Sequence, residues 1–84
     1  MEQTEEQGWI QRAQQGDEAG FSRLVQMYQK KVYAFVLGMV HDPGTADELT
    51  QTTFLKIWKS LPGFRSESTF QTWLFQIALN SVRK

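Results

Sequence analysis

The sequence predicts an all-α fold, a compact bundle of three main helices preceded by a short N-terminal helix. Apolar residues recur at spacings of three and four in four segments, whereas the period-two alternation of a β-strand is sustained nowhere. Both prolines lie between these segments, where helices are expected to end. At 84 residues the chain has the length of one domain, residues 1–84, so its core has to be small and well patterned.

The first two helices have recognisable end signals. Thr4 is the expected N-cap of a helix that runs to about Gln15, and Gly16 is the expected stop. Asp17 predicts the N-cap of a long second helix. The apolar stripes predicted for their inner faces are Trp9, Ile10 and Ala13, and then Phe21, Leu24, Val25, Tyr28, Val32, Phe35, Val36 and Met39.

The third helix is expected after a turn at residues 41–44. Thr45 and Glu48 have the spacing of a capping box, in which each side chain bonds to a free backbone N–H of the other residue. Pro62 and Gly63 predict the end of the helix. Its predicted inner face comprises Ala46, Leu49, Thr50, Thr53, Phe54, Ile57, Trp58 and Leu61.

The fourth helix is expected after a short loop at residues 64–67. Ser68 and Gln71 have the capping-box spacing that predicts its start, and the apolar period then continues to the end of the sequence. Its predicted inner face comprises Phe70, Trp73, Leu74, Ile77, Ala78 and Ser81.

The residue types needed for catalysis or metal binding are scarce. There is no cysteine, and the single histidine, His41, lies in a predicted turn. Asp47 and Glu48 are adjacent on a helix, so their side chains diverge, and no glycine-rich phosphate loop is present. We therefore expect no enzyme, no metal site and no cofactor. No signal peptide or apolar run long enough to cross a bilayer is found, so a soluble cytoplasmic protein without membrane insertion is expected.

Charge is divided unequally along a chain whose net charge is zero. Residues 1–29 carry five carboxylates and two cations, and residues 30–84 carry seven cations and four carboxylates, which gives net charges of −3 and +3. A basic C-terminal part permits contact with nucleic acid. An asymmetry of this size also arises by chance in neutral domains, so both interpretations stay open.

The outer face of the third helix carries an apolar residue, Leu55, directly opposite the core stripe. Its neighbours on that face are Asp47, Glu48, Gln51, Thr52 and Lys59. A single exposed leucine is common on protein surfaces. Alternatively, Leu55 is the apolar anchor of a face that docks onto a partner.

A polar stripe on the fourth helix is the second feature that the core does not explain. It comprises Thr69, Thr72, Gln76, Asn80 and Arg83, with Phe75 and Leu79 beside it. A polar helix face is usually only solvated, yet this stripe lacks the Glu/Lys mixture of an ordinary solvent face. Amide and hydroxyl groups that bond to base edges, bordered by cations that bond to phosphates, are typical of nucleic-acid recognition.

Several stretches of the sequence resemble region 2 of the extracytoplasmic-function (ECF) sigma factors of the sigma-70 family. The run FRSESTFQTWLFQIALN is specific, because its loop, cap and aromatic positions all coincide with the family pattern. The matching stretches are residues 16–19 (GDEA), 46–56 (ADELTQTTFLK), 61–74 (LPGFRSESTFQTWL) and 77–80 (IALN), within a resemblance that spans about residues 8–84.

The resemblance implies a division of labour between the helices. Residues 17–41 would be region 2.1, which is mostly core, and residues 45–61 would be region 2.2. Region 2.2 docks onto a coiled coil of the largest catalytic subunit of core RNA polymerase. The residues that this implies for polymerase binding are Asp47, Glu48, Gln51, Leu55 and Lys59.

The resemblance also implies a DNA-binding site at the C-terminal end. Residues 62–68 would be the region 2.3 loop and residues 69–84 the region 2.4 helix, which together bind and help to melt the −10 promoter element through its single-stranded non-template strand. One base would be extruded into a pocket formed by the loop. The implied DNA-binding residues are Phe64, Arg65, Ser66, Glu67, Ser68, Thr72, Gln76, Asn80, Arg83 and Lys84.

Three positions depart from the family pattern. Ser66 stands where the family usually has glycine, Thr52 replaces a usual glutamate, and Leu79 stands where a basic residue is common. Family members also continue into a helix-turn-helix region 4, so we expect the chain, which lacks region 4, to be an excised domain rather than a natural fragment that acts alone, and to be a monomer when isolated. The alternative function is that of a helical protein-interaction module that acts chiefly by binding an anti-sigma factor.

Overall fold

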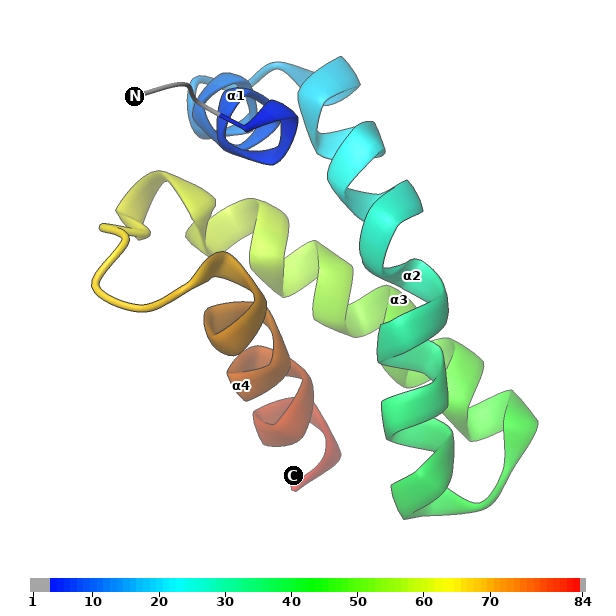
Figure 1. Cartoon of the computed structure of the whole chain (residues 1–84). Coiled ribbons are helices and arrows are strands. Elements are labelled where there is room, and N and C mark those ends of the chain that lie inside the picture. The colour runs from blue at the N-terminus through cyan, green and yellow to red at the C-terminus, as the bar shows by residue number, and fades with distance from the viewer. Residues whose placement is uncertain (1–3, 84) are drawn as a thin grey trace.

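The computed structural model describes residues 4–83, which form the four predicted helices (Figure 1). The elements are α1 (Glu5–Gln14), α2 (Glu18–Val40), α3 (Pro43–Ser60), the short 3-10 turn η1 (Leu61–Gly63) and α4 (Phe70–Val82). The chain reverses direction between α2 and α3, and again between α3 and α4 (Figure 1). α1 packs against the N-terminal part of α2 and against η1. The all-α fold class is confirmed.

The first two helix starts agree with the prediction. Thr4 caps α1 in a capping box with Gln7, and Asp17 caps α2 by accepting a hydrogen bond from the Ala19 N–H at 3.0 Å. Gly16 ends α1 with a φ of +92°, a conformation that glycine adopts without steric cost. Gly20 allows α1 and α2 to approach closely, because a Cβ there would lie 3.0 Å from the Trp9 carbonyl oxygen.

The other two helix starts were predicted wrongly. α3 begins at Pro43 rather than at Thr45, and its cap is Asp42, whose carboxylate accepts from the Thr45 N–H at 2.8 Å and the Thr45 hydroxyl at 2.7 Å. These two bonds hold the pKa of the Asp42 carboxyl below its ordinary value. An N–H at the first helical position would have no partner within the helix. Proline has no N–H, so it is favoured at this position.

The cap of α4 is Thr69 rather than Ser68. The Thr69 hydroxyl accepts from the Thr72 N–H at 3.1 Å, and the Ser68 hydroxyl instead donates to the Thr69 carbonyl. The predicted capping box of Ser68 with Gln71 is therefore absent. α4 ends at Val82, with Arg83 as its C-cap, and Lys84 lies outside the described residues.

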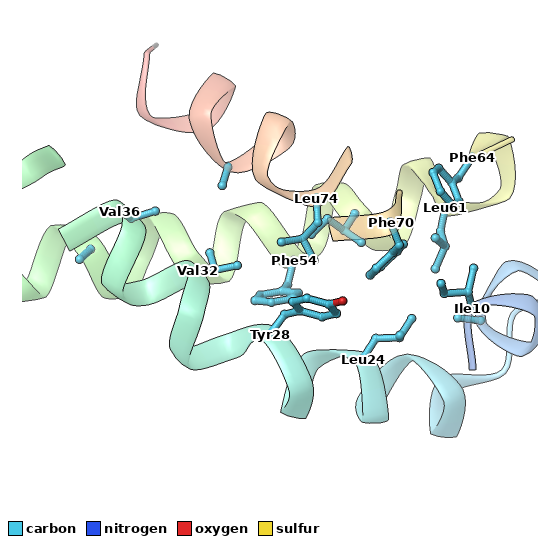
Figure 2. Close-up of a cluster of buried hydrophobic side chains, with 14 residues drawn as sticks. Ile10, Leu24, Tyr28, Val32, Val36, Phe54, Leu61, Phe64, Phe70 and Leu74 are labelled. Carbon is cyan, nitrogen blue, oxygen red and sulfur yellow. The ribbon is translucent and has the colours of Figure 1, made fainter. Parts of the chain in front are cut away.

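The core lies where α2, α3 and α4 meet, and α1 and the segment after α3 extend it (Figure 2). Tyr28 and Phe70 face each other there, with ring centroids 5.7 Å apart. No buried side-chain nitrogen or oxygen lacks a hydrogen-bond partner within residues 4–83. The buried apolar residues are Ile10, Ala13, Leu24, Tyr28, Val32, Val36, Ala46, Phe54, Ile57, Leu61, Phe64, Phe70, Leu74 and Ala78.

One predicted core residue is on the surface. Phe35 belongs to the apolar period of α2, yet 36% of its surface is exposed. Its ring lies against Phe75 of α4 at the edge of the core, with an angle of 73° between the rings. Helical period alone does not tell the centre of an apolar stripe from its margin, which explains the error.

The described residues contain neither a membrane-spanning helix nor a metal cluster. Among residues 4–83 no helix combines the length and apolarity needed to cross a bilayer. No group of three histidine, aspartate or glutamate side chains in that part of the chain is close enough to hold a metal ion.

Candidate functional site

The loop between η1 and α4 encloses a hollow of about 320 Å³. Its lining residues are Gly63, Phe64, Arg65, Glu67, Ser68 and Trp73. The Phe64 ring is 9% exposed and packs against Trp73, at a centroid distance of 4.8 Å, and edge-on against Phe70. Phe64 is therefore anchored in the core beneath the hollow, while the polar residues of the loop are exposed around it.

Hydrogen bonds from α1 fix the entrance to this loop. The Gln14 amide donates to the Leu61 carbonyl at 3.2 Å and to the Phe64 carbonyl at 2.8 Å. The Phe64 N–H donates back to the Leu61 carbonyl and closes η1. Gln14 was not predicted as a site residue. It lies 50 positions from Phe64 in the sequence, and the helical spacing of residues around Gln14 does not indicate a contact with a distant loop.

Ser66, within the loop, has a left-handed backbone conformation with a φ of 61°. Such a φ is uncommon for residues other than glycine. This backbone conformation explains why glycine is usual at this position, since a glycine adopts it without strain, and Ser66 in its place carries a steric cost.

The polar stripe of α4 is exposed as predicted. Thr72, Gln76, Asn80 and Arg83 are all exposed and follow one another at spacings of three and four. The Thr72 hydroxyl accepts from that of Thr69 at 2.9 Å. Within residues 4–83, no hydrogen bond to another protein group engages the side chain of Gln76 or Asn80. Their amides are thus available to donate to, and accept from, a ligand.

A second concave surface lies between α2 and α3, on another side of the molecule. It is a groove of about 540 Å³, and Leu55, with 62% of its surface exposed, lies on it. The lining residues are Glu18, Phe21, Ser22, Val25 and Gln29 from α2, and Asp47, Thr50, Gln51, Phe54, Leu55 and Trp58 from α3. This surface is called the α2–α3 groove below.

The structure brings together three of the five predicted polymerase-binding residues in the α2–α3 groove: Asp47, Gln51 and Leu55. Glu48 and Lys59 are exposed on α3 but do not line it. Phe21 and Trp58 were assigned to the core alone, yet their rings, 4.8 Å apart, form part of the groove. The only sequence signal for this was the width of the apolar stripe on α2, which is greater than a single neighbouring helix can cover.

The α2–α3 groove and the α4 stripe differ in charge, whereas the loop hollow is lined by both Arg65 and Glu67. The α2–α3 groove carries the carboxylates of Glu18 and Asp47. In contrast, the sequence from Ser68 to Lys84 has no carboxylate and carries two cations. A small helical domain with concave surfaces that combine apolar and polar side chains has the features of a binding domain.

Comparison with known proteins identifies the family. Residues 24–84 match the family described as Sigma-70 region 2. The chain belongs to this family, and its relatives place it among the ECF sigma factors. This is a family of transcription initiation factor domains and not of enzymes.

The relatives are similar over almost the whole chain. The RNA polymerase sigma-H factor of Pseudomonas aeruginosa is 36% identical over 83 residues, or 99% of this chain and 43% of its own length. The ECF RNA polymerase sigma-E factor of Haemophilus influenzae is 39% identical over 82 residues, or 98% of this chain and 43% of its own length. The chain thus spans less than half the length of these curated relatives.

A solved structure has the same fold. It is an NMR structure of an engineered region 2 of sigmaE in complex with GTAAAA, and it is 33% identical, with a TM-score of 0.86. The similarity covers 96% of this chain and 83% of that one.

Proposed function

We propose that this chain binds the single-stranded non-template strand of the −10 promoter element with the loop and α4, and docks onto core RNA polymerase with the α2–α3 groove. The observation that carries the proposal is the hollow at residues 63–68, which opens beside an exposed stripe of amides on α4. A structural neighbour 33% identical to this chain was solved in complex with the oligonucleotide GTAAAA, which supports a DNA strand as the ligand.

The physical task at the −10 element is to keep open a duplex that would otherwise re-pair. A base captured outside the stack stabilises the melted strand, against an unstacking cost of a few kcal/mol. The hollow offers the indole of Trp73 as an apolar surface and the exposed residues Glu67 and Ser68 for hydrogen bonds to the base edge. Ser66 lies in the same loop but does not line the hollow. Asn80, further along α4, would bond to a second base edge, and Arg65 and Arg83 would bond to phosphates.

The α2–α3 groove has the properties of a protein-docking site. An exposed leucine at an aromatic-lined groove is a suitable anchor, and the surrounding polar side chains provide specificity. The carboxylates of Glu18 and Asp47 favour a partner segment that is basic at the contact. Docking by this groove leaves the α4 stripe accessible to DNA.

The proposal is tested first by titrating the protein at low salt with single-stranded hexamers of varied sequence, with residue-resolved NMR shifts. Shifts should cluster at residues 64–69 and 76–83 and depend on sequence. Asn80→Ala should weaken binding about tenfold, as expected for the loss of a base-edge contact. Gln26→Ala, an exposed amide on α2, is the matched control and should bind as wild type. If Asn80→Ala binds unchanged, Asn80 is not in the site.

Polymerase docking is tested separately by a pull-down with core RNA polymerase. Leu55→Asp should abolish it and leave oligonucleotide affinity intact, whereas Met27→Asp, an equally drastic change at another exposed apolar residue, should leave docking intact. Normal docking of Leu55→Asp would refute the assignment of the groove.

A second candidate function uses the same groove, because its volume of about 540 Å³ exceeds that of the loop hollow and its apolar residues suit any helical partner. In that case the chain would act chiefly by binding an anti-sigma factor. The hexamer titration separates the two functions, since a pure protein-binding module gives no sequence-dependent shifts.

A further inference from the structure

A third hollow, of about 350 Å³, lies between the C-terminal half of α2 and α4. Its lining residues are Phe35, Gln71, Thr72, Phe75, Gln76 and Leu79. Within this lining the Phe35 and Phe75 rings meet edge-to-face, with centroids 5.1 Å apart. This surface is called the Phe35–Phe75 hollow below.

The core leaves this aromatic pair only partly covered. The other members of the same stripe on α2, such as Leu24, Val32 and Val36, are almost completely buried. Phe35 keeps 36% of its surface exposed, and Phe75 and Leu79 are half-buried beside it. An apolar hollow with amide side chains at its rim is the usual composition of a ligand site.

The charges around this hollow select an anionic ligand. α2 has no carboxylate between Ala19 and Val40, and α4 has none at all. The cations nearest to the hollow along these helices are Lys31, one turn before Phe35 on α2, and Arg83, one turn after Leu79 on α4. The α2–α3 groove differs in having the carboxylates of Glu18 and Asp47 on its surface. The Phe35–Phe75 hollow is apolar and has no carboxylate on the helix segments that form it, so it suits a flat ring attached to a negatively charged backbone. A nucleotide strand has that chemistry.

The position of the hollow continues the proposed DNA-binding face. At about 100° per residue, the α4 stripe of Thr72, Gln76 and Asn80 has Trp73 on one side and Phe75 on the other. Trp73 lines the loop hollow, whereas Thr72 and Gln76 line the Phe35–Phe75 hollow as well as the stripe. A strand that crosses the stripe therefore meets one hollow at each margin.

We propose that Phe35 and Phe75 form a second base-binding site, which stacks another nucleobase of the single strand whose extruded base enters the loop hollow. This inference rests on the proposed function and extends it. Stacking on an aromatic ring tolerates any base, so this site adds affinity for the open strand and little sequence preference. Gln71 and Gln76 at the rim donate to, or accept from, the edge of the stacked base.

The test uses the tightest-binding hexamer from the titration and a set of its derivatives, each with one abasic position. Phe75→Leu and Phe35→Leu keep apolar volume but remove a ring, and each should weaken binding of the intact hexamer about five- to a hundredfold. Phe75→Tyr keeps the ring and should bind as wild type. Tyr33→Leu removes a ring on α2 outside the three hollows and is the matched control.

The abasic derivatives locate the base that stacks. In the wild-type protein an abasic position should weaken binding where it removes the base of the loop hollow, the base whose edge Asn80 contacts, or the base stacked at Phe35 and Phe75. In Phe75→Leu the last of these positions should lose its effect, because the missing base no longer has a ring to stack on, while the others should keep theirs.

The outcomes separate this inference from the proposed function. If Asn80→Ala weakens hexamer binding while Phe35→Leu and Phe75→Leu bind as wild type, the second site is refuted and the proposed function stands. If the wild-type protein binds no hexamer, the proposed function fails and the second site with it. Should Phe75→Leu unfold, as shown by circular dichroism, the exposed ring of Phe35 decides, since its replacement leaves the core intact.

Discussion

Ser66 carries backbone strain at the centre of the candidate DNA-binding loop. Its φ of 61° places Cβ close to the following carbonyl oxygen, which costs about 1–2 kcal/mol for an L-residue. Ser66→Gly removes this cost, and the greater flexibility of glycine in the unfolded chain offsets part of the gain. We expect the free energy of unfolding, measured in urea, to rise by up to about 1 kcal/mol.

The matched control is Ser68→Gly, two residues further along the same exposed loop and without a positive φ. There glycine relieves nothing, so stability should stay equal or fall. If the free energy of unfolding falls as much in Ser66→Gly as in Ser68→Gly, the backbone at residue 66 is not strained.

Tyr28 joins α2 to α1 through a polar contact at the margin of the core. Its hydroxyl donates to the Glu6 carboxylate at 2.6 Å. Burial raises the pKa of Tyr28, and the hydrogen bond to Glu6 and its negative charge raise that pKa further. The folded chain therefore keeps the phenol proton at pH values where the unfolded chain loses it, so stability is retained below the ordinary pKa of 10.0 and falls as the pH rises above it.

We expect Tyr28→Phe to be less stable than wild type by about 1 kcal/mol near neutral pH, because the hydrogen bond is lost. Between about pH 9 and pH 11, urea unfolding should show a shallower fall in stability for this variant than for the wild-type protein. Tyr33→Phe, the control, keeps Tyr28, and its free energy of unfolding should fall with pH as steeply as that of the wild-type protein. Equal slopes for wild type and Tyr28→Phe would rule out the raised pKa as the cause.

At the scale of elements, α1 supports the candidate DNA-binding loop although it contributes none of the lining of the loop hollow. Its last residue, Gln14, holds the Leu61 and Phe64 carbonyls by two hydrogen bonds. Gln14→Met keeps the length of the side chain and removes both. The free energy of unfolding should fall by about 1–2 kcal/mol, and the Phe64 N–H, which closes η1, should exchange with solvent faster.

Gln15→Met is the control for this prediction, since Gln15 is adjacent and exposed. It should change neither stability nor the exchange of the Phe64 N–H. Unchanged exchange in Gln14→Met would show that η1 holds its shape without α1.

The sequence was sufficient to predict the helices but only half of their caps. Thr4 and Asp17 were correct because each is the single strong capping residue near its helix start. Before α3 and α4 two capping residues lie close together, Asp42 with Thr45 and Ser68 with Thr69. Choosing between them depends on φ and ψ at each position, and the spacing of side chains does not give these angles.

The candidate site was predictable to a similar degree. Exposure of Leu55 and of the α4 stripe followed from helical period, because residues opposite a core stripe face solvent. The grooves did not follow, because each joins residues from two helices whose separation and relative rotation are set by packing. Phe35 and Gln14 owe their roles to such contacts.

On the scale of the whole molecule, the proposed partners approach surfaces of opposite character. The α2–α3 groove has carboxylates at Glu18 and Asp47, and these would repel a phosphate backbone. The loop presents Arg65 beside Glu67, and the end of α4 presents Arg83, all three exposed. In the proposed function a neutral chain thereby separates its protein and nucleic-acid contacts, and its affinity for DNA would depend on a few cations.

This small number of cations gives DNA binding a measurable salt dependence. Each phosphate contact on a single strand contributes about −0.7 to the slope of log K against log salt concentration. Arg65→Gln and Arg83→Gln should each make the slope shallower by about 0.7, and the double variant by about 1.4, because Arg65 lies in the loop before α4 and Arg83 is the C-cap of α4, so that the two act independently. Arg12→Gln, an exposed cation on α1, should leave the slope unchanged. Hexamer binding whose slope is insensitive to Arg65 and Arg83 would mean that the strand's phosphates lie elsewhere, and a slope that changes with Arg12 instead would place them along α1.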